Sequence, residues 1–88
     1  MKTIIPESVK NVINNFPCNS DRMLDKRSYF YRVYDALKGA KSFLEIGYRK
    51  GIFVEVCKVL DIKSVHIDIS SDLLRAKPTE RNKCITSD

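Results

Sequence analysis

The sequence lacks the features of a membrane or secreted protein. No apolar run approaches the roughly 20 residues that a membrane helix needs, and the first ten residues, MKTIIPESVK, contain too short an apolar stretch for a signal peptide. Cys18, Cys57 and Cys84 are odd in number, far apart and without C-x-x-C spacing, which indicates neither a disulfide framework nor a zinc site. We therefore expect a cytoplasmic protein with reduced thiols, no membrane segment and no metal.

The composition is that of one small globular domain. The chain has 88 residues, of which 43% are hydrophobic and 31% charged, so a second core is not expected. Its net charge of +5 is spread along the chain rather than clustered. Such a charge serves solubility or, as the alternative, binding to nucleic acid.

Helical periodicity dominates the first 40 residues. Apolar residues recur with a spacing of three and four at Val9, Val12, Ile13 and Phe16, which predicts a helix from Glu7 to Asn15 or Phe16. The same spacing predicts a second helix, ended by Gly39, and its apolar positions are Phe30, Val33, Tyr34 and Leu37. Met23 and Leu24 extend this stripe backwards by two turns. The aromatic cluster around Arg27 and Arg32 fits a helix core or, as the alternative, a stacking platform for bases.

Strand and helix patterns alternate in the second half. Ser42–Ile46 is predicted as a strand covered on both faces, as in a parallel sheet. A helix from about Gly51 to Leu60 and a second strand from Ser64 to Ile69 follow. We further expect a short helix from about Ser70 to Ala76, a polar turn at 79–82, and a third strand at 84–86.

These elements predict an α/β fold of partial Rossmann-like type. Two N-terminal helices precede a short parallel sheet of order 3-2-1 with a right-handed crossover helix. Residues 1–88 form a single domain, with a helical lead-in at 1–40 and a cofactor-binding half at 41–88. The first strand is left with an open edge.

The stretch between the first two strands carries the chemical signal. Gly47 removes a side chain where the strand turns, and Gly51 lets the next helix begin close to the strand. We expect the amides from Arg49 to Ile52 to point outward unsatisfied, and with Arg49 and Lys50 to attract a phosphate or carboxylate. Asp68, 21 positions after Gly47, suits a ribose-binding acid, or else a helix cap.

Other residues in this half have weaker signals. Glu45 stands in an apolar strand, where a carboxylate needs a partner, so we expect it to meet loop amides or a ligand ammonium. His66, the only histidine, fits a hydrogen-bonded sheet residue better than a base. The spacing G-x-x-x-G matches neither the phosphate loop nor G-x-G-x-x-G, and no Ser/His/Asp order is supported.

The run Leu44-Glu45-Ile46-Gly47 with Gly51, followed by His66-Ile67-Asp68, resembles motif I and the next acidic position of class I S-adenosylmethionine-dependent methyltransferases. The resemblance implies that S-adenosylmethionine is the cofactor. Its implied binding residues are Glu45, Gly47, Tyr48, Arg49, Gly51, Asp68, Ile69 and Asp88. It covers about half of the chain and assigns no catalytic residue.

The expected function is therefore that of a truncated or minimal methyltransferase that binds S-adenosylmethionine. The alternative is a non-catalytic module, derived from a methyltransferase fold, that sequesters the cofactor or binds a partner. An open apolar edge invites association, so we expect a homo-oligomer or a partner chain that covers it.

Overall fold

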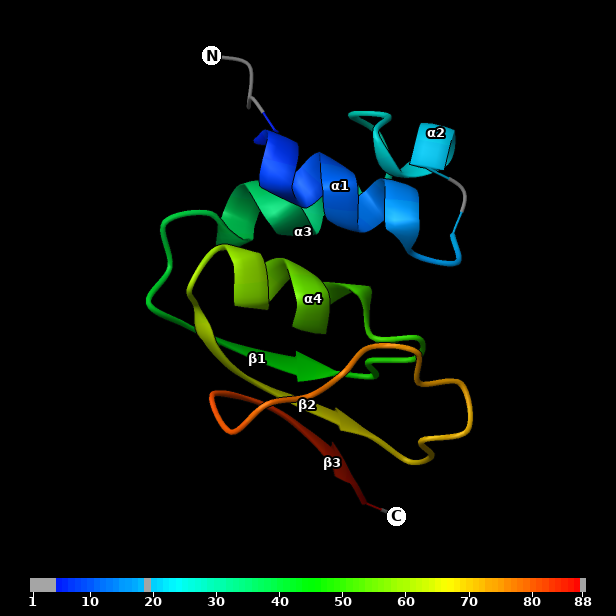
Figure 1. Ribbon diagram of the computed structural model, residues 1–88, viewed down its shortest axis with the longest axis vertical. Helices are drawn as coiled ribbons and strands as arrows, with labels where there is room; N and C mark the ends of the chain where they lie inside the picture. Colours follow the sequence, from blue (N-terminus) through cyan, green and yellow to red (C-terminus); the bar gives the residue numbers. More distant parts are fainter. Residues whose placement is uncertain (1–4, 19, 88) are drawn as a thin grey trace.

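The structure is a computed structural model that describes residues 5–18 and 20–87. Four helices and three strands follow one another in the order shown in Figure 1. The helices are α1 (Glu7–Asn15), α2 (Ser20–Met23), α3 (Tyr29–Leu37) and α4 (Ile52–Val59). The strands are β1 (Ser42–Ile46), β2 (Lys63–Asp68) and β3 (Asn82–Thr86).

The two helices predicted from periodicity are present, but the second is shorter than expected. In α1, Val9 and Ile13 are fully buried, and the helix ends at Asn15 as predicted. The backward extension of α3 through Met23 and Leu24 is wrong, because α2 is a separate short helix and α3 begins at Tyr29. The Ser28 hydroxyl caps α3 by accepting a hydrogen bond from the Tyr31 amide at 3.0 Å.

The strands form one parallel sheet in the order β1-β2-β3, so β1 and β3 are its edges. The register pairs Glu45 with His66 and Ile46 with Ile67, and it pairs Ile67 with Ile85. All described helices lie on one side of this sheet (Figure 1). The prediction that β1 is covered on both faces is therefore wrong: Leu44 is 63% exposed and Ile46 is 74% exposed.

The connection between β2 and β3 contains no helix, which contradicts the short helix predicted for residues 70–76. The chain instead passes over the start of α4, where the amides of Arg75 and Ala76 donate hydrogen bonds to the Lys50 carbonyl. Turn formation at 79–82 agrees with the prediction, since the Thr79 and Asn82 backbones bond to each other in both directions. β3 begins at Asn82, two residues earlier than expected.

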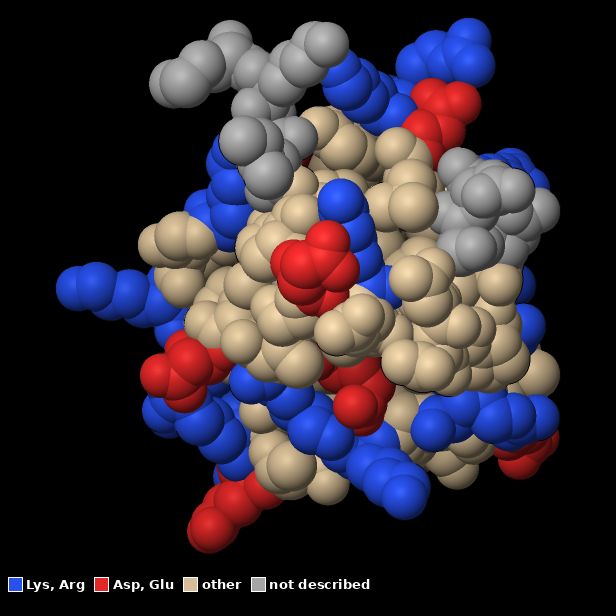
Figure 2. Space-filling model, turned by 45° about the horizontal axis from the view of Figure 1, so that its top comes forward, with Lys and Arg blue, Asp and Glu red and all other residues tan. Residues whose placement is uncertain are grey.

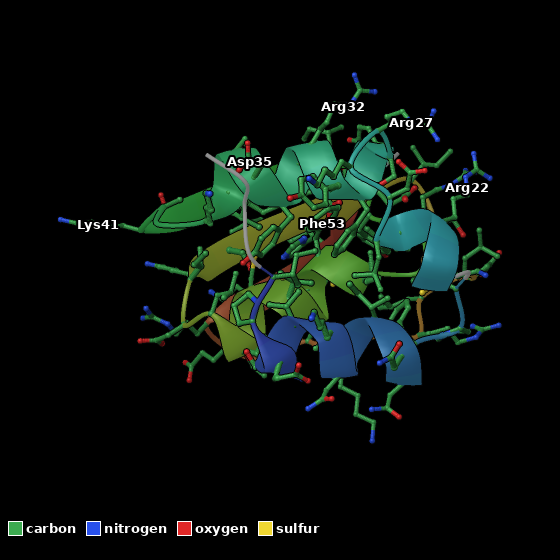
Figure 3. The ribbon with its side chains drawn as sticks, turned by 90° about the horizontal axis from the view of Figure 1, so that it is seen from above. Arg22, Arg27, Arg32, Asp35, Lys41 and Phe53 are labelled. Carbon is green, nitrogen blue, oxygen red and sulfur yellow. The ribbon has the colours of Figure 1, made fainter. Side chains whose placement is uncertain are left out.

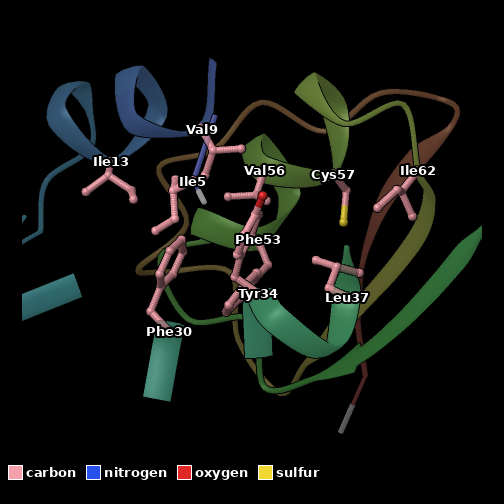
Figure 4. Close-up of a cluster of buried hydrophobic side chains, with 10 residues drawn as sticks. All are labelled: Ile5, Val9, Ile13, Phe30, Tyr34, Leu37, Phe53, Val56, Cys57 and Ile62. Atoms are coloured by element: carbon pink, nitrogen blue, oxygen red, sulfur yellow. The ribbon is translucent and has the colours of Figure 1, made fainter. Parts of the chain in front are cut away.

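The core lies between α4 and the helices α1 and α3 (Figure 4). Phe53 is at its centre and stacks on Phe30, with ring centroids 5.0 Å apart. On the side of the sheet, the ring centroid of Phe53 lies 6.1 Å from that of Phe43. Val56 and Cys57 of α4 are fully buried beside it. The helical lead-in and the first β-α-β unit therefore share one core, which fixes α3 relative to the turn after β1.

The distribution of charge and the hydrophobicity of the helices are two further properties of the structure. Figure 2 shows basic side chains scattered over the helical face, with acidic side chains between them. Within residues 5–18 and 20–87, no helix has the combination of length and hydrophobicity that crossing a bilayer requires.

Candidate functional site

The turn from β1 into α4 is built from left-handed backbone conformations. Gly47 has φ 87°, Arg49 has φ 54° and Gly51 has φ 90°. Such φ values favour glycine, so the two glycines are where the backbone needs them. The Gly47 amide donates to the Ile67 carbonyl at 2.6 Å, which ties the start of the turn to the end of β2.

Asp68 at the tip of β2 holds this turn in place. Its Oδ2 accepts a hydrogen bond from the Arg49 amide at 2.9 Å, and its Oδ1 accepts one from the Ile69 amide at 2.7 Å. The Arg49 amide above all, with the Ile69 amide, holds the pKa of Asp68 below its usual range. Asp68 does not cap a helix, because no helix follows β2.

Two of the amides expected to point outward unsatisfied are bonded within the protein. The Arg49 amide binds Asp68, and the Gly51 amide donates to the Tyr48 carbonyl at 2.8 Å. The prediction is wrong for these two groups because the turn folds back on itself and on β2. At the start of α4, the amides of Ile52 and Phe53 have no acceptor among the described residues.

Gly51 also allows a close approach of the β2–β3 connection. A Cβ atom at this position would lie 2.8 Å from both the Ala76 Cβ and the Leu74 Cδ1. Such distances are shorter than real Cβ contacts, so any side chain would push this connection away from α4. Tyr48, in the middle of the turn, is buried and has its hydroxyl 3.5 Å from the Thr86 Oγ1 in β3.

A cavity of about 790 Å³ lies between this turn and the segment that contains α2 and the start of α3. Five residues predicted to bind the cofactor line it: Glu45, Gly47, Tyr48, Arg49 and Gly51. Asp68 and Ile69 lie at the tip of β2 and are outside the cavity lining. Asp88 lies outside the described residues.

The opposite wall of the cavity was not predicted from the sequence. It comes from residues between 22 and 32, with Phe16 and Cys18 beside them, and it includes three arginines and an exposed aromatic residue, namely Arg22, Arg27, Arg32 and Tyr29. The sequence shows an aromatic cluster beside Arg27 and Arg32, but it does not show which ring is exposed. That depends on how α3 packs on Phe53.

Glu45 takes part in a buried chain of hydrogen bonds instead of meeting loop amides, so the loop-amide alternative is wrong, and the ligand-ammonium alternative stays a prediction. Its Oε1 lies 2.6 Å from the His66 Nδ1, and the His66 Nε2 lies 2.7 Å from the Ser64 Oγ. The Asn82 amide group donates to the Ser64 Oγ at 2.9 Å and to the Ile62 carbonyl at 2.7 Å. His66 is confirmed as a hydrogen-bonded sheet residue.

This chain has the residue types of a hydrolase triad but not its access. His66 is 0% exposed and Ser64 is 2% exposed, so a substrate has no route to the serine hydroxyl. The described residues leave no buried side-chain nitrogen or oxygen without a hydrogen-bond partner. The arrangement therefore joins the three strands through their helix-facing side chains, and its role is structural.

The thiols and acidic groups offer no further chemistry. Burial raises the pKa of Cys57 to about 11, so this thiol is a poor nucleophile. All three cysteines are free. No group of three or more His, Cys, Asp or Glu side chains within the described ranges is arranged to hold a metal ion.

Comparison with known proteins gives no assignment, since no protein-family model, curated protein or solved structure matches this chain.

Proposed function

We propose that the chain binds S-adenosylmethionine in the cavity beside the β1–α4 turn, as the cofactor-binding part of a Rossmann-type methyltransferase fold. One observation carries the proposal: five residues predicted from the sequence line a single cavity of about 790 Å³ at the carboxyl end of β1. Ligands of parallel α/β sheets bind at this end of the strands. The volume also falls within the roughly 300–1,000 Å³ of small-molecule sites.

The chemistry of the turn fits the methionine part of the cofactor. The free amides of Ile52 and Phe53 lie at the positive end of the α4 dipole, and Arg49 and Lys50 add positive charge beside them. These groups suit a carboxylate. No atom lies within 4 Å of where a Cβ on Gly47 would stand, so the glycine leaves room for a ligand against the backbone.

Asp68 and Ile69 are assigned to the ribose and adenine. The Asp68 carboxylate accepts hydrogen bonds from the backbone amides of Arg49 and Ile69, and a carboxylate has about four acceptor sites, which leaves capacity for a hydroxyl group. Ile69 is 74% exposed beside it and offers an apolar surface to a base. The carboxylate would thus both fix the turn, through the Arg49 amide, and bind the ribose.

Methyl transfer from this cofactor would depend on positioning. S-adenosylmethionine, when bound, would supply an activated methyl group to the lone pair of an acceptor, with the electron pair of the carbon–sulfur bond left on sulfur and the acceptor's proton released to solvent. The chain would contribute by holding the two reactants in line. No described residue is assigned a catalytic role.

Calorimetry with S-adenosylmethionine and its demethylated product tests the proposal. Gly47→Ala and Gly39→Ala are a matched pair, since both glycines have positive φ (87° and 81°) and open space for a methyl group. Gly47 lines the cavity and Gly39 does not. We expect wild type and Gly39→Ala to bind both ligands and Gly47→Ala to bind them at least ten-fold more weakly.

The absence of heat with both ligands would overturn the cofactor proposal. If binding is observed, transfer of a labelled methyl group to a panel of acceptors separates a methyltransferase from a sequestering module. Product formation supports the enzyme, and binding without transfer supports the module.

A second function, self-association through β1, is favoured by the character of this edge strand. β1 reads SFLEI and contains neither lysine nor proline, two residues that commonly protect an edge strand. β3 carries Lys83 at its edge. The occupant that we propose is therefore the β1 strand of a second copy, paired across a two-fold axis.

Light scattering at micromolar concentration tests this association. We expect a dimer in wild type, a monomer for Leu44→Lys, which places a charge on the edge strand, and a dimer for Ile85→Lys at the other edge. Leu44 is 63% and Ile85 is 44% exposed, so neither change disturbs the core. A monomeric wild type contradicts the proposal, and so does equal loss of the dimer in both variants.

A further inference from the structure

The wall of the cavity formed by Arg22, Arg27, Tyr29 and Arg32, here called the α2–α3 wall, is basic. Figure 3 shows the three arginines along one side of the molecule, on α2, the following turn and α3, with their side chains pointing outward. The β1–α4 turn adds Arg49 and Lys50 from the opposite side of the same cavity. Positive charge that is scattered along the sequence is thus gathered around one hollow.

The acidic residues of the cavity are already paired. Asp25 accepts hydrogen bonds from the Arg27 Nε at 3.2 Å and Nη2 at 3.1 Å, and Glu45 is held by His66. The guanidinium of Arg32 has no acceptor in the described part of the chain. With Asp25 and Glu45 held by these partners, the guanidinium groups of Arg32 and Arg49 remain beside the cavity with no carboxylate of the described residues at ion-pair distance, and such groups attract phosphates.

The exposed ring of Tyr29 supports a nucleic-acid ligand independently of the positive charge of the cavity. All eight aromatic residues lie within the described ranges, and Tyr29, at 74% exposure, is the one that is exposed. It is the first residue of α3, whose buried face is formed by Phe30, Tyr34 and Leu37, so its ring has no part in the core. A flat apolar ring among arginines offers a surface on which a base can stack.

We propose that the α2–α3 wall binds single-stranded nucleic acid, with a base stacked on Tyr29 and flanking phosphates held by Arg32 of the wall and by Arg49 across the cavity. A single strand presents base faces and phosphates together, which is the combination that this wall can satisfy. A duplex hides its base faces, and an acidic peptide would leave Tyr29 without a partner. The inference goes beyond cofactor binding and does not depend on it.

Fluorescence anisotropy with labelled 12-nucleotide single strands of RNA and DNA tests the inference on the full chain. A duplex of the same sequence and an oligoglutamate peptide serve as competitors. Tyr29→Ala removes the ring from an exposed position, and Tyr29→Phe keeps it. Arg32→Gln removes a charge from the wall, whereas Arg81→Gln removes the same charge from the exposed turn before β3.

We expect the single strands to bind, with affinity that falls as salt is raised. Tyr29→Ala should weaken binding by about 5- to 150-fold, the size expected for the loss of one stacked base, and Tyr29→Phe should leave it within about two-fold. Arg32→Gln should lower the slope of log K against log salt by about 1, and Arg81→Gln should leave that slope unchanged.

Several results would overturn the inference. The first is the absence of single-strand binding at low salt. The second is a duplex or peptide that competes more tightly than the unlabelled single strand. The third is an equal effect of Arg32→Gln and Arg81→Gln on the salt slope together with an unchanged affinity of Tyr29→Ala. The last result would mean attraction by net charge alone. Preference for RNA or for DNA supports the inference in either case, and defines which strand is used.

Discussion

Gly51→Ala should be the most damaging of the three possible glycine-to-alanine changes, for a reason that comes from packing. Gly39, Gly47 and Gly51 have nearly the same positive φ, at 81°, 87° and 90°. A methyl group on Gly39 or Gly47 meets no atom within 4 Å, whereas on Gly51 it lies 2.8 Å from Ala76 and from Leu74. The three substitutions therefore have a similar cost from the left-handed backbone conformation, and only Gly51→Ala adds a steric clash.

The expected losses of unfolding free energy differ clearly between Gly51→Ala and the other two substitutions. A left-handed conformation costs an alanine about 1–2 kcal/mol at each site. Overpacking adds about 1–3 kcal/mol at Gly51. The leucine side chain can rotate away, but Ala76 has no rotamer to change, and its amide is bonded to the Lys50 carbonyl at 3.2 Å. We expect Gly51→Ala to lower the free energy of unfolding by about 2–5 kcal/mol, and Gly39→Ala by about 1–2 kcal/mol.

Urea and thermal unfolding followed by circular dichroism measure these differences. For a chain of 88 residues, 1 kcal/mol corresponds to a shift in Tm of about 5 °C. The double variant Gly51→Ala with Ala76→Gly removes the colliding Cβ and should recover part of the loss, as a coupling energy of about 1 kcal/mol or more. Equal destabilisation by Gly51→Ala and Gly39→Ala, or no coupling with Ala76, would refute the packing argument.

Three further predictions concern other parts of the structure. Glu45→Ala leaves the fully buried His66 without its Nδ1 partner and should lower the free energy of unfolding in urea by about 1–3 kcal/mol. The control Glu80→Ala, at an exposed position, should change this free energy by less than about 0.5 kcal/mol. Equal effects of the two substitutions would contradict the buried pairing. Cys57, with its pKa raised to about 11 by burial, should react with a thiol reagent at pH 8 only as fast as the protein unfolds, and rapid labelling in native buffer would show that the thiol is accessible. The pKa of Asp68 is held below its ordinary 3.8 by the amides of the turn, so its carboxylate contributes stability that is fully present above that value and is lost as pH falls through the lower, folded pKa. The difference in Tm between wild type and Asp68→Asn should accordingly be constant near neutral pH and shrink below pH 3.8, and a difference that persists unchanged to pH 2 would contradict this account.

Local patterns were sufficient to predict most of the elements. Apolar residues spaced by three and four define α1 and the body of α3, since one helical face must be buried whatever it packs against. The apolar runs at Ser42–Ile46 and Ser64–Ile69 predicted the first two strands, which the structure has at Ser42–Ile46 and Lys63–Asp68. Gly47 and Gly51 marked the turn, because few other residues adopt positive φ.

The sequence by itself thus determined most of the elements and the residues of the β1–α4 turn, while the tertiary structure decided which residues pack against them. The pairing of Glu45 with His66 depends on the parallel register of β1 and β2, which brings together residues 21 positions apart. The exposed face of the sheet and the α2–α3 wall depend on which layers pack together. These properties are set by contacts between distant segments, and periodicity along the chain reports only which side of each segment is apolar.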